Sequence, residues 1–326
     1  MENLENKIKK AQESEEKYDF LGASIQYKEA LQMAQKLSQK EKIKELKNKL
    51  LTVGAKINFK TLTVEQHIPN SSIDDFINLI IKDGDGLPII LKTIGCHYYF
   101  YPRIKNILNE AKNTMPIMFQ LATLTTFSDK GHVIEGGSDP QIAWTAKIYG
   151  ISQGIITNLY LKRMFETLKQ KNNLNGGTLF SYIEQKGIFP TNSLPLIKKG
   201  VEKYFEGDYI SALHILVPQF ESSFLYISEK LGIDIIALNR SPEVSTRTKV
   251  LSETNLDSSE FRNVWKEDFC EQVKYILFSP LGYKLRHKIA HGNIDPIECN
   301  QSNTELILYL FLVLAGRVEI KSQVKK

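Results

Sequence analysis

The chain has 326 residues, of which 42% are hydrophobic and 24% are charged, proportions that are ordinary for a soluble globular protein. Its three cysteines, Cys96, Cys270 and Cys299, are far apart, which excludes a cysteine metal site and predicts a reducing compartment without structural disulfides. The net charge is +5, but residues 195–326 carry 17 Lys and Arg against 17 Asp and Glu. A broadly basic nucleic-acid surface is therefore excluded there, and any such contact must be local.

The sequence gives no sign of a membrane segment. The first residues are charged rather than apolar, so we expect no secretory signal. The longest apolar run covers residues 306–316, which is too short to cross a bilayer and predicts a buried core helix. We therefore expect a soluble, cytoplasmic protein that makes no membrane contact.

Residues 1–60 form the first predicted domain, with three highly charged helices between residues 3 and 58. Ala23, Tyr27 and Ala30 follow the packing positions of a tetratricopeptide-like helical hairpin. A single such unit cannot bury its own face, so it predicts a surface for a protein partner or a second copy. An ordinary helical hairpin explains the same pattern.

Residues 61–194 form a predicted helical middle domain. Its clearest loop covers residues 128–140, which contain three glycines but lack the spacing of a phosphate-binding loop. A long helical pattern follows over residues 141–171, and Pro190 and Pro195 mark the next boundary.

Residues 195–326 form the third predicted domain. Helical patterns cover residues 201–205, 209–231, 261–278 and 306–318, and residues 233–258 are expected to be irregular. No segment of the whole chain alternates convincingly like a strand, so we predict an all-α protein.

The strongest chemical pattern is the stretch from Tyr283 to Gly292. Arg286, His287 and His291 lie at what we predict to be the end of a short helix, because Gly292 follows. His287 and His291 are four residues apart and share one helix face, whereas Arg286 and His291 lie about 140° apart on a regular helix. Joining Arg286 to His291 therefore requires the long Arg stem, a distorted helix end or a second chain.

These residue types suit cleavage of an RNA phosphodiester. Arg grips phosphate through parallel hydrogen bonds, and His transfers protons near neutral pH, so no metal or other cofactor is required. The chain also lacks the carboxylate-rich set that a metal-dependent hydrolase needs. A structural role, in which Arg286 and a His bind helix carbonyls or a neighbouring helix, explains the same spacing.

The stretch from Arg286 to Gly292 resembles the Arg-x4-6-His signature of the HEPN superfamily. It is similar to the Arg-Asn-x-x-x-His-Gly form of a subfamily that includes a eukaryotic protein named for endoplasmic-reticulum membrane-associated RNA degradation. Residues 212–221 resemble the His-x-x-x-Pro-x-x-Glu helix of the same family, with His214, Pro218 and Glu221 at its positions. The resemblance covers about residues 195–320.

The resemblance implies a metal-independent endoribonuclease, acting in phage defence or as a toxin, whose homodimer brings two motifs together. It implies Arg286 and His291 as the catalytic pair, while His287 stands where the subfamily has Asn. Glu221 either holds this pair in place or is an exposed helix residue. A non-catalytic interaction or nucleotide-binding protein remains the alternative.

The basic residues around the motif predict local RNA contacts. Lys284 and Lys288 form one cluster with the motif, and Arg247 and Lys249 form a second in a Ser/Thr-rich loop. A solvated connector is the alternative explanation of that loop, and the one we favour.

Overall fold

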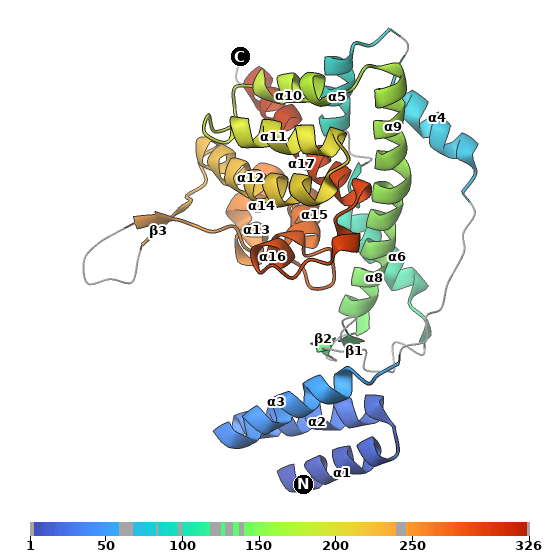
Figure 1. The fold of residues 1–326 in the computed structure, drawn as a ribbon, viewed down its shortest axis with the longest axis vertical. Coiled ribbons are helices and arrows are strands. Elements are labelled where there is room, and N and C mark those ends of the chain that lie inside the picture. The colour runs from blue at the N-terminus through green and yellow to red at the C-terminus, as the bar shows by residue number, and fades with distance from the viewer. Residues whose placement is uncertain are drawn as a thin grey trace. The chain divides into compact units, whose positions relative to one another are not determined.

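The computed structural model describes residues 3–58, 68–82, 84–96, 100–117, 125–127, 133–136, 140–238 and 246–324 (Figure 1). Helices dominate these ranges, and their strands form only two short antiparallel pairs, so the all-α prediction is confirmed. By their contacts the residues form two compact units, Met1–Gln66 with Met115–Trp144 and His67–Thr114 with Thr145–Lys326. The domain boundaries expected from the sequence stay a prediction.

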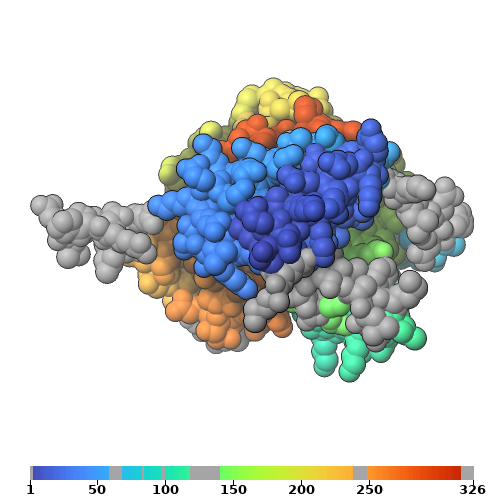
Figure 2. Space-filling view, turned by 90° about the horizontal axis from the view of Figure 1, so that it is seen from below, coloured from blue at the N-terminus to red at the C-terminus, as the bar shows by residue number. Residues whose placement is uncertain are grey.

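The first unit begins with the three predicted helices, α1 (Leu4–Glu16), α2 (Phe20–Lys36) and α3 (Lys40–Gly54). Their side chains form one continuous packed surface in the space-filling view (Figure 2). Ala23 and Ala30 are completely buried and Tyr27 is 1% exposed, as the spacing predicts. The Tyr27 hydroxyl donates to Glu15 Oε2 at 3.1 Å, and Lys49 and Lys56 pair with the same carboxylate.

The same unit contains the strands β1 (Thr125–Phe127) and β2 (Val133–Gly136), which pair antiparallel. The predicted loop over residues 128–140 therefore contains a strand. The remaining loop residues before Pro140 lie outside the described ranges.

The second unit is a helical bundle with one hairpin. Its first half contains α4 (Asn70–Ile80), α5 (Leu87–Cys96), α6 (Ile104–Thr114), the π-helix η2 (Ile156–Leu161), α9 (Lys162–Lys171), α10 (Gly176–Glu184) and α11 (Leu194–Phe205). The long helix α12 (Tyr209–Lys230) and the hairpin strands β3 (Ile236–Leu238) and β4 (Thr246–Thr248) follow. The last elements are α13 (Glu253–Asp257), α14 (Ser259–Trp265), α15 (Glu267–Leu277), α16 (Leu285–Ala290), the 3-10 helix η3 (Pro296–Glu298) and α17 (Gln301–Val324). Helix α8 (Pro140–Ile155) runs directly into η2.

Helix α17 is the centre of this bundle. Every side chain from Leu306 to Ala315 is completely buried, so the apolar run is a core helix as predicted. It packs closely on α5, where Gly95 leaves no room for a side chain against the Leu312 backbone. None of the helices in the described part of the chain is both long and apolar enough to cross a lipid bilayer.

Two predicted long helices are interrupted. The pattern over residues 141–171 is divided by the π-turn η2, where the buried Thr157 hydroxyl donates to the Gln153 carbonyl oxygen at 2.8 Å. Gln272 of α15 donates in turn to the Gln153 side chain at 3.1 Å. The pattern over residues 261–278 breaks at Lys266, whose φ of 71° ends α14 and starts α15.

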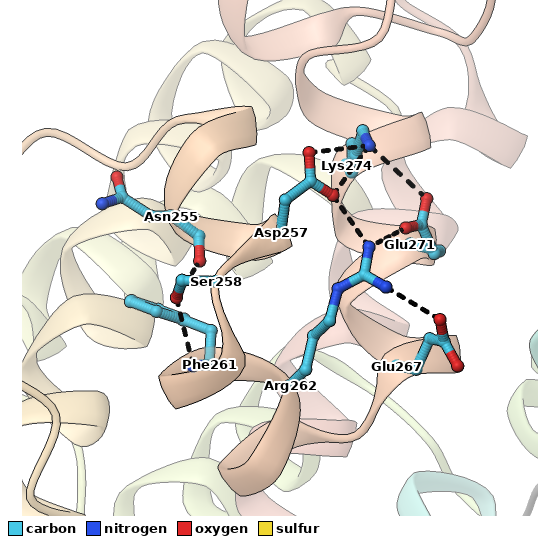
Figure 3. A network of polar contacts seen from close by, with 8 residues as sticks. All are labelled: Asn255, Asp257, Ser258, Phe261, Arg262, Glu267, Glu271 and Lys274. Carbon is cyan, nitrogen blue, oxygen red and sulfur yellow. Dashed lines mark hydrogen bonds and ion pairs between the residues drawn. The ribbon is translucent and has the colours of Figure 1, made fainter.

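A network of ion pairs fastens α13, α14 and α15 to one another (Figure 3). Arg262 of α14 donates to Asp257 and Glu267 at 2.8 Å each and also to Glu271. Lys274 of α15 donates to Asp257 at 2.9 Å. Because α15 packs on α16, this network supports one side of the motif helix.

Candidate functional site on helix α16

Helix α16 is short because its ends are fixed by backbone conformation. Lys284 precedes it with a left-handed φ of 55°, and Leu285, the first helical residue, is completely buried. His291 caps its C-terminal end, and Gly292 follows with a φ of 64°, a conformation that suits glycine. The predicted helix end is confirmed, and the polar side chains between these anchors, Arg286, His287 and Lys288, are half-buried.

Arg286 forms an ion pair with Glu221 of α12. Its Nε donates to Glu221 Oε2 at 2.9 Å and its Nη2 lies 3.5 Å from Oε1. The Arg286 side chain is 27% exposed and that of Glu221 is 15% exposed, so the pair lies at the edge of the core. The alternative of an exposed, unengaged Glu221 is therefore wrong.

The Glu221 carboxylate has a further bond that the sequence does not reveal. Its Oε1 accepts the Leu251 backbone N–H at 3.2 Å. Glu221 therefore joins α12, the motif helix and the chain segment that follows β4.

His287 and His291 lie together, as their spacing predicts. Their ring centroids are 4.3 Å apart with planes at 51°, and His287 is half-buried while His291 is exposed. Burial lowers the pKa of His287 below its ordinary 6.5, and the neighbouring Lys284, His291 and Arg286 lower it further. His287 is therefore neutral at neutral pH and able to accept a proton.

The predicted basic contacts differ from one another. Lys288 pairs with Glu298, and Lys249 donates to the Asp234 carbonyl oxygen at 2.8 Å and to its carboxylate at 3.3 Å. Among the described residues, Lys284 has no ion-pair partner. Arg247 is the residue of β4 opposite Ala237 of β3, and its side chain lies outside the described part of the structure.

His214, from the second resembling segment, has a local role. Its Nδ1 lies 2.8 Å from the Ile210 carbonyl oxygen one turn earlier in α12, and its side chain is exposed. Among the described residues it has no hydrogen bond to the motif, whereas Glu221 from the same helix bonds to Arg286.

The structure thus groups the predicted residues into two pairs, Arg286 with Glu221 and His287 with His291. On a regular helix, positions 287 and 291 lie about 100° and 140° around the axis from position 286. The Arg286 side chain is directed to Glu221 of α12, whereas the two histidine rings contact each other. Within one copy the arginine and the histidine pair therefore form separate contacts. Within the described ranges, no three His, Cys, Asp or Glu side chains converge in a way that would hold a metal ion.

Glu298 is the charged neighbour that the sequence analysis missed. It lies in a capping box with Asp295, whose side chain accepts the Ile297 N–H at 3.0 Å. The signal was present, because an Asp followed three residues later by Glu is typical of a capped helical turn.

Comparison with known proteins found no matching family model, no matching curated protein and no matching solved structure. The resemblance to the HEPN superfamily therefore depends on the two short sequence motifs alone.

Proposed function

We propose that the second unit is a metal-independent endoribonuclease of HEPN type, with its site at Arg286, His287 and His291. The observation that carries this proposal is the arrangement of α16. One short helix carries an arginine fixed by a carboxylate and two neighbouring imidazoles, one of them with a lowered pKa.

The ion pair with Glu221 leaves Arg286 able to bind a phosphate. The carboxylate occupies the edge of the guanidinium formed by Nε and Nη2, and Nη1 has no hydrogen bond to any described residue. The remaining N–H groups form the end-on edge, which can donate two parallel bonds to a phosphate. A fixed, partly exposed guanidinium loses little freedom when it binds a ligand.

The two imidazoles suit proton transfer during cleavage. Neutral His287 is able to take the proton from the ribose 2′-hydroxyl as its oxygen attacks phosphorus and displaces the 5′-oxygen. His291, at the exposed end of α16, would give a proton to that leaving oxygen. Arg286 would stabilise the extra negative charge on the phosphorane, and the product would carry a 2′,3′-cyclic phosphate.

A second copy would complete the site. Arg286 and the histidine pair point in different directions within one chain, so a dimer that apposes two α16 helices would bring the Arg of one copy to the histidines of the other. Two exposed apolar side chains adjoin residues that bond to the motif or its support: Val250, 54% exposed, precedes Leu251, and Ile297, 80% exposed, precedes Glu298. Both are available for such an interface.

One observation favours the non-catalytic alternative. Arg286 pairs with Glu221 and Lys288 with Glu298, so two of the positive charges at the motif are already balanced. An interaction protein that uses Arg286 only to join α12 and α16 would show the same pairs.

RNA cleavage by the EDTA-treated protein tests the proposal. We expect single-stranded RNA to be cut to fragments with 2′,3′-cyclic phosphate ends. We expect Arg286→Ala and His291→Ala each to lose about 100-fold or more in rate. Lys199→Ala, at an exposed pair on α11, is the matched control and should cleave like the parent.

Melting temperatures of the four proteins separate chemistry from folding. His291 is exposed, so His291→Ala should melt close to the parent. Equal cleavage by all four proteins, or no cleavage by the folded parent, would reject the catalytic assignment and favour the interaction protein.

A further inference from the structure

The root of the β3–β4 hairpin is held by two charged residues, Asp234 and Lys249. Asp234 Oδ1 accepts the Ile236 N–H at 2.8 Å, and the Lys249 ammonium bonds to both the Asp234 carbonyl oxygen and its carboxylate. The Lys249 N–H donates to the Ile235 carbonyl oxygen at 2.7 Å, which extends the ladder beyond β4. These bonds fix the direction in which the chain leaves the hairpin.

Just after this root, the chain reaches a residue that bonds to Glu221, the partner of Arg286. Lys249 lies two residues before Leu251, whose N–H donates to Glu221 Oε1 at 3.2 Å. The other oxygen of that carboxylate accepts Arg286 Nε at 2.9 Å. One carboxylate therefore links the hairpin root to Arg286.

The far side of Leu251 is fixed independently. Leu251 is 1% exposed, and Ser252 caps α13 immediately after it. Asp257 at the end of α13 is fastened to Arg262 and Lys274 (Figure 3). Movement of the Leu251 amide must therefore come from the hairpin side, where the two described strands lead away from the helices of this unit (Figure 1).

We infer that Asp234 and Lys249 are positioning residues for Arg286, acting through the Leu251 amide and Glu221. The Leu251 N–H orients the Glu221 carboxylate so that its second oxygen faces Arg286. Without the root bonds this amide moves away, the carboxylate rotates more freely, and the Arg286 guanidinium spends more time unbonded.

This inference rests on the proposed function, which assigns phosphate binding to Arg286, but its test does not require RNA cleavage. The full chain is treated with phenylglyoxal, which modifies accessible guanidinium groups, and the modification rates of Arg286 and Arg262 are followed by mass spectrometry. We expect Asp234→Ala and Lys249→Ala to raise the Arg286 rate severalfold. Lys249→Arg, which keeps a donor to Asp234, should restore most of the parent rate.

Two controls make the result decisive. Arg262 is held by its own carboxylates and should react at the parent rate in every variant, and Glu202→Ala on α11 should change neither arginine. Glu221→Ala, which removes the link itself, should raise the Arg286 rate most. An unchanged or lower Arg286 rate in Asp234→Ala and Lys249→Ala would overturn the inference, whether or not the protein cleaves RNA.

Discussion

At the scale of single residues, the pKa of His287 is set by its neighbours. Burial and then the charge of Lys284 lower the pKa of His287. Lys284→Ala should therefore move this pKa upward, toward the ordinary 6.5, while burial keeps it from rising fully. NMR titration of the His287 ring proton measures the shift.

The remote Lys199→Ala variant is the control for this titration and should leave His287 as it is in the parent. A parent His287 that titrates at or above 6.5, or one that does not respond to Lys284→Ala, would contradict the electrostatic account of α16.

At this scale the motif and its partner Glu221 could be predicted from the sequence, but the bonds that support them could not. The i, i+4 spacing places His287 next to His291, and Gly292 ends the helix, because both depend on local geometry. Glu221 was a candidate through the family resemblance. Its bond to the Leu251 amide and the bond from Lys249 to Asp234 depend on tertiary contacts, which residue spacing does not encode.

At the scale of elements, α5 and α17 lie close together because Gly95 has no side chain. A Cβ on Gly95 would lie 2.1 Å from the Leu312 carbonyl oxygen. Gly95→Ala should therefore destabilise the protein by about 1–3 kcal/mol through overpacking. Gly154→Ala in α8 is the matched control, because its Cβ meets nothing within 4 Å.

The control variant should be neutral or more stable by up to about 1 kcal/mol, since Ala favours the helix. Urea unfolding of the two variants and the parent gives both values. If Gly95→Ala were as stable as Gly154→Ala, the packing of α17 on α5 described here would be wrong.

Helix α17 also carries a buried carboxylate. Glu305 is completely buried, its Oε1 accepts from Tyr204 and Gln301, and Lys169 lies 3.5 Å away. Burial is the largest influence and raises the pKa of Glu305 above its ordinary 4.5. The folded protein therefore binds this proton more tightly than the unfolded chain does.

The consequence for stability has a definite sign. As pH rises from 4.5 through the raised pKa, ionisation of Glu305 costs the folded state free energy, and the free energy of unfolding falls. Glu305→Gln removes this cost and keeps an oxygen that accepts from Tyr204. Its stability relative to the parent should therefore increase with pH over that window.

Denaturant unfolding at a series of pH values tests this prediction, with Glu202→Gln on α11 as the control for loss of an exposed charge. A constant difference between Glu305→Gln and the parent across the series would mean that the folded state does not favour protonated Glu305.

The elements differ in how far the sequence predicts them. The three N-terminal helices and α17 follow from their apolar spacing and were predicted correctly. The π-turn at Thr157 and the break at Lys266 were missed, because the apolar pattern continues through both.

Buried polar contacts between Gln153 and Gln272 accompany the π-turn, and the positive φ of Lys266 marks the break between α14 and α15. The β3–β4 hairpin was missed because its strands have three residues each, too few for alternation to be recognised.

At the scale of the whole molecule, the proposal requires two copies. In a two-fold dimer with shared sites, each site takes Arg286 from one chain and the histidines from the other. Variants that lack different halves of the site should then complement one another. A mixture of Arg286→Ala and His291→Ala contains hybrid dimers in which one site has both groups.

The most direct measurement is RNA cleavage by Arg286→Ala, by His291→Ala and by their mixture, after the chains have been allowed to exchange. The account predicts that each variant alone is inactive and that random exchange restores about a quarter of the parent rate, since half of the dimers are hybrid with one intact site each. Either variant cleaving alone at the parent rate would contradict the account, as would a mixture that stays inactive although hybrid dimers have formed.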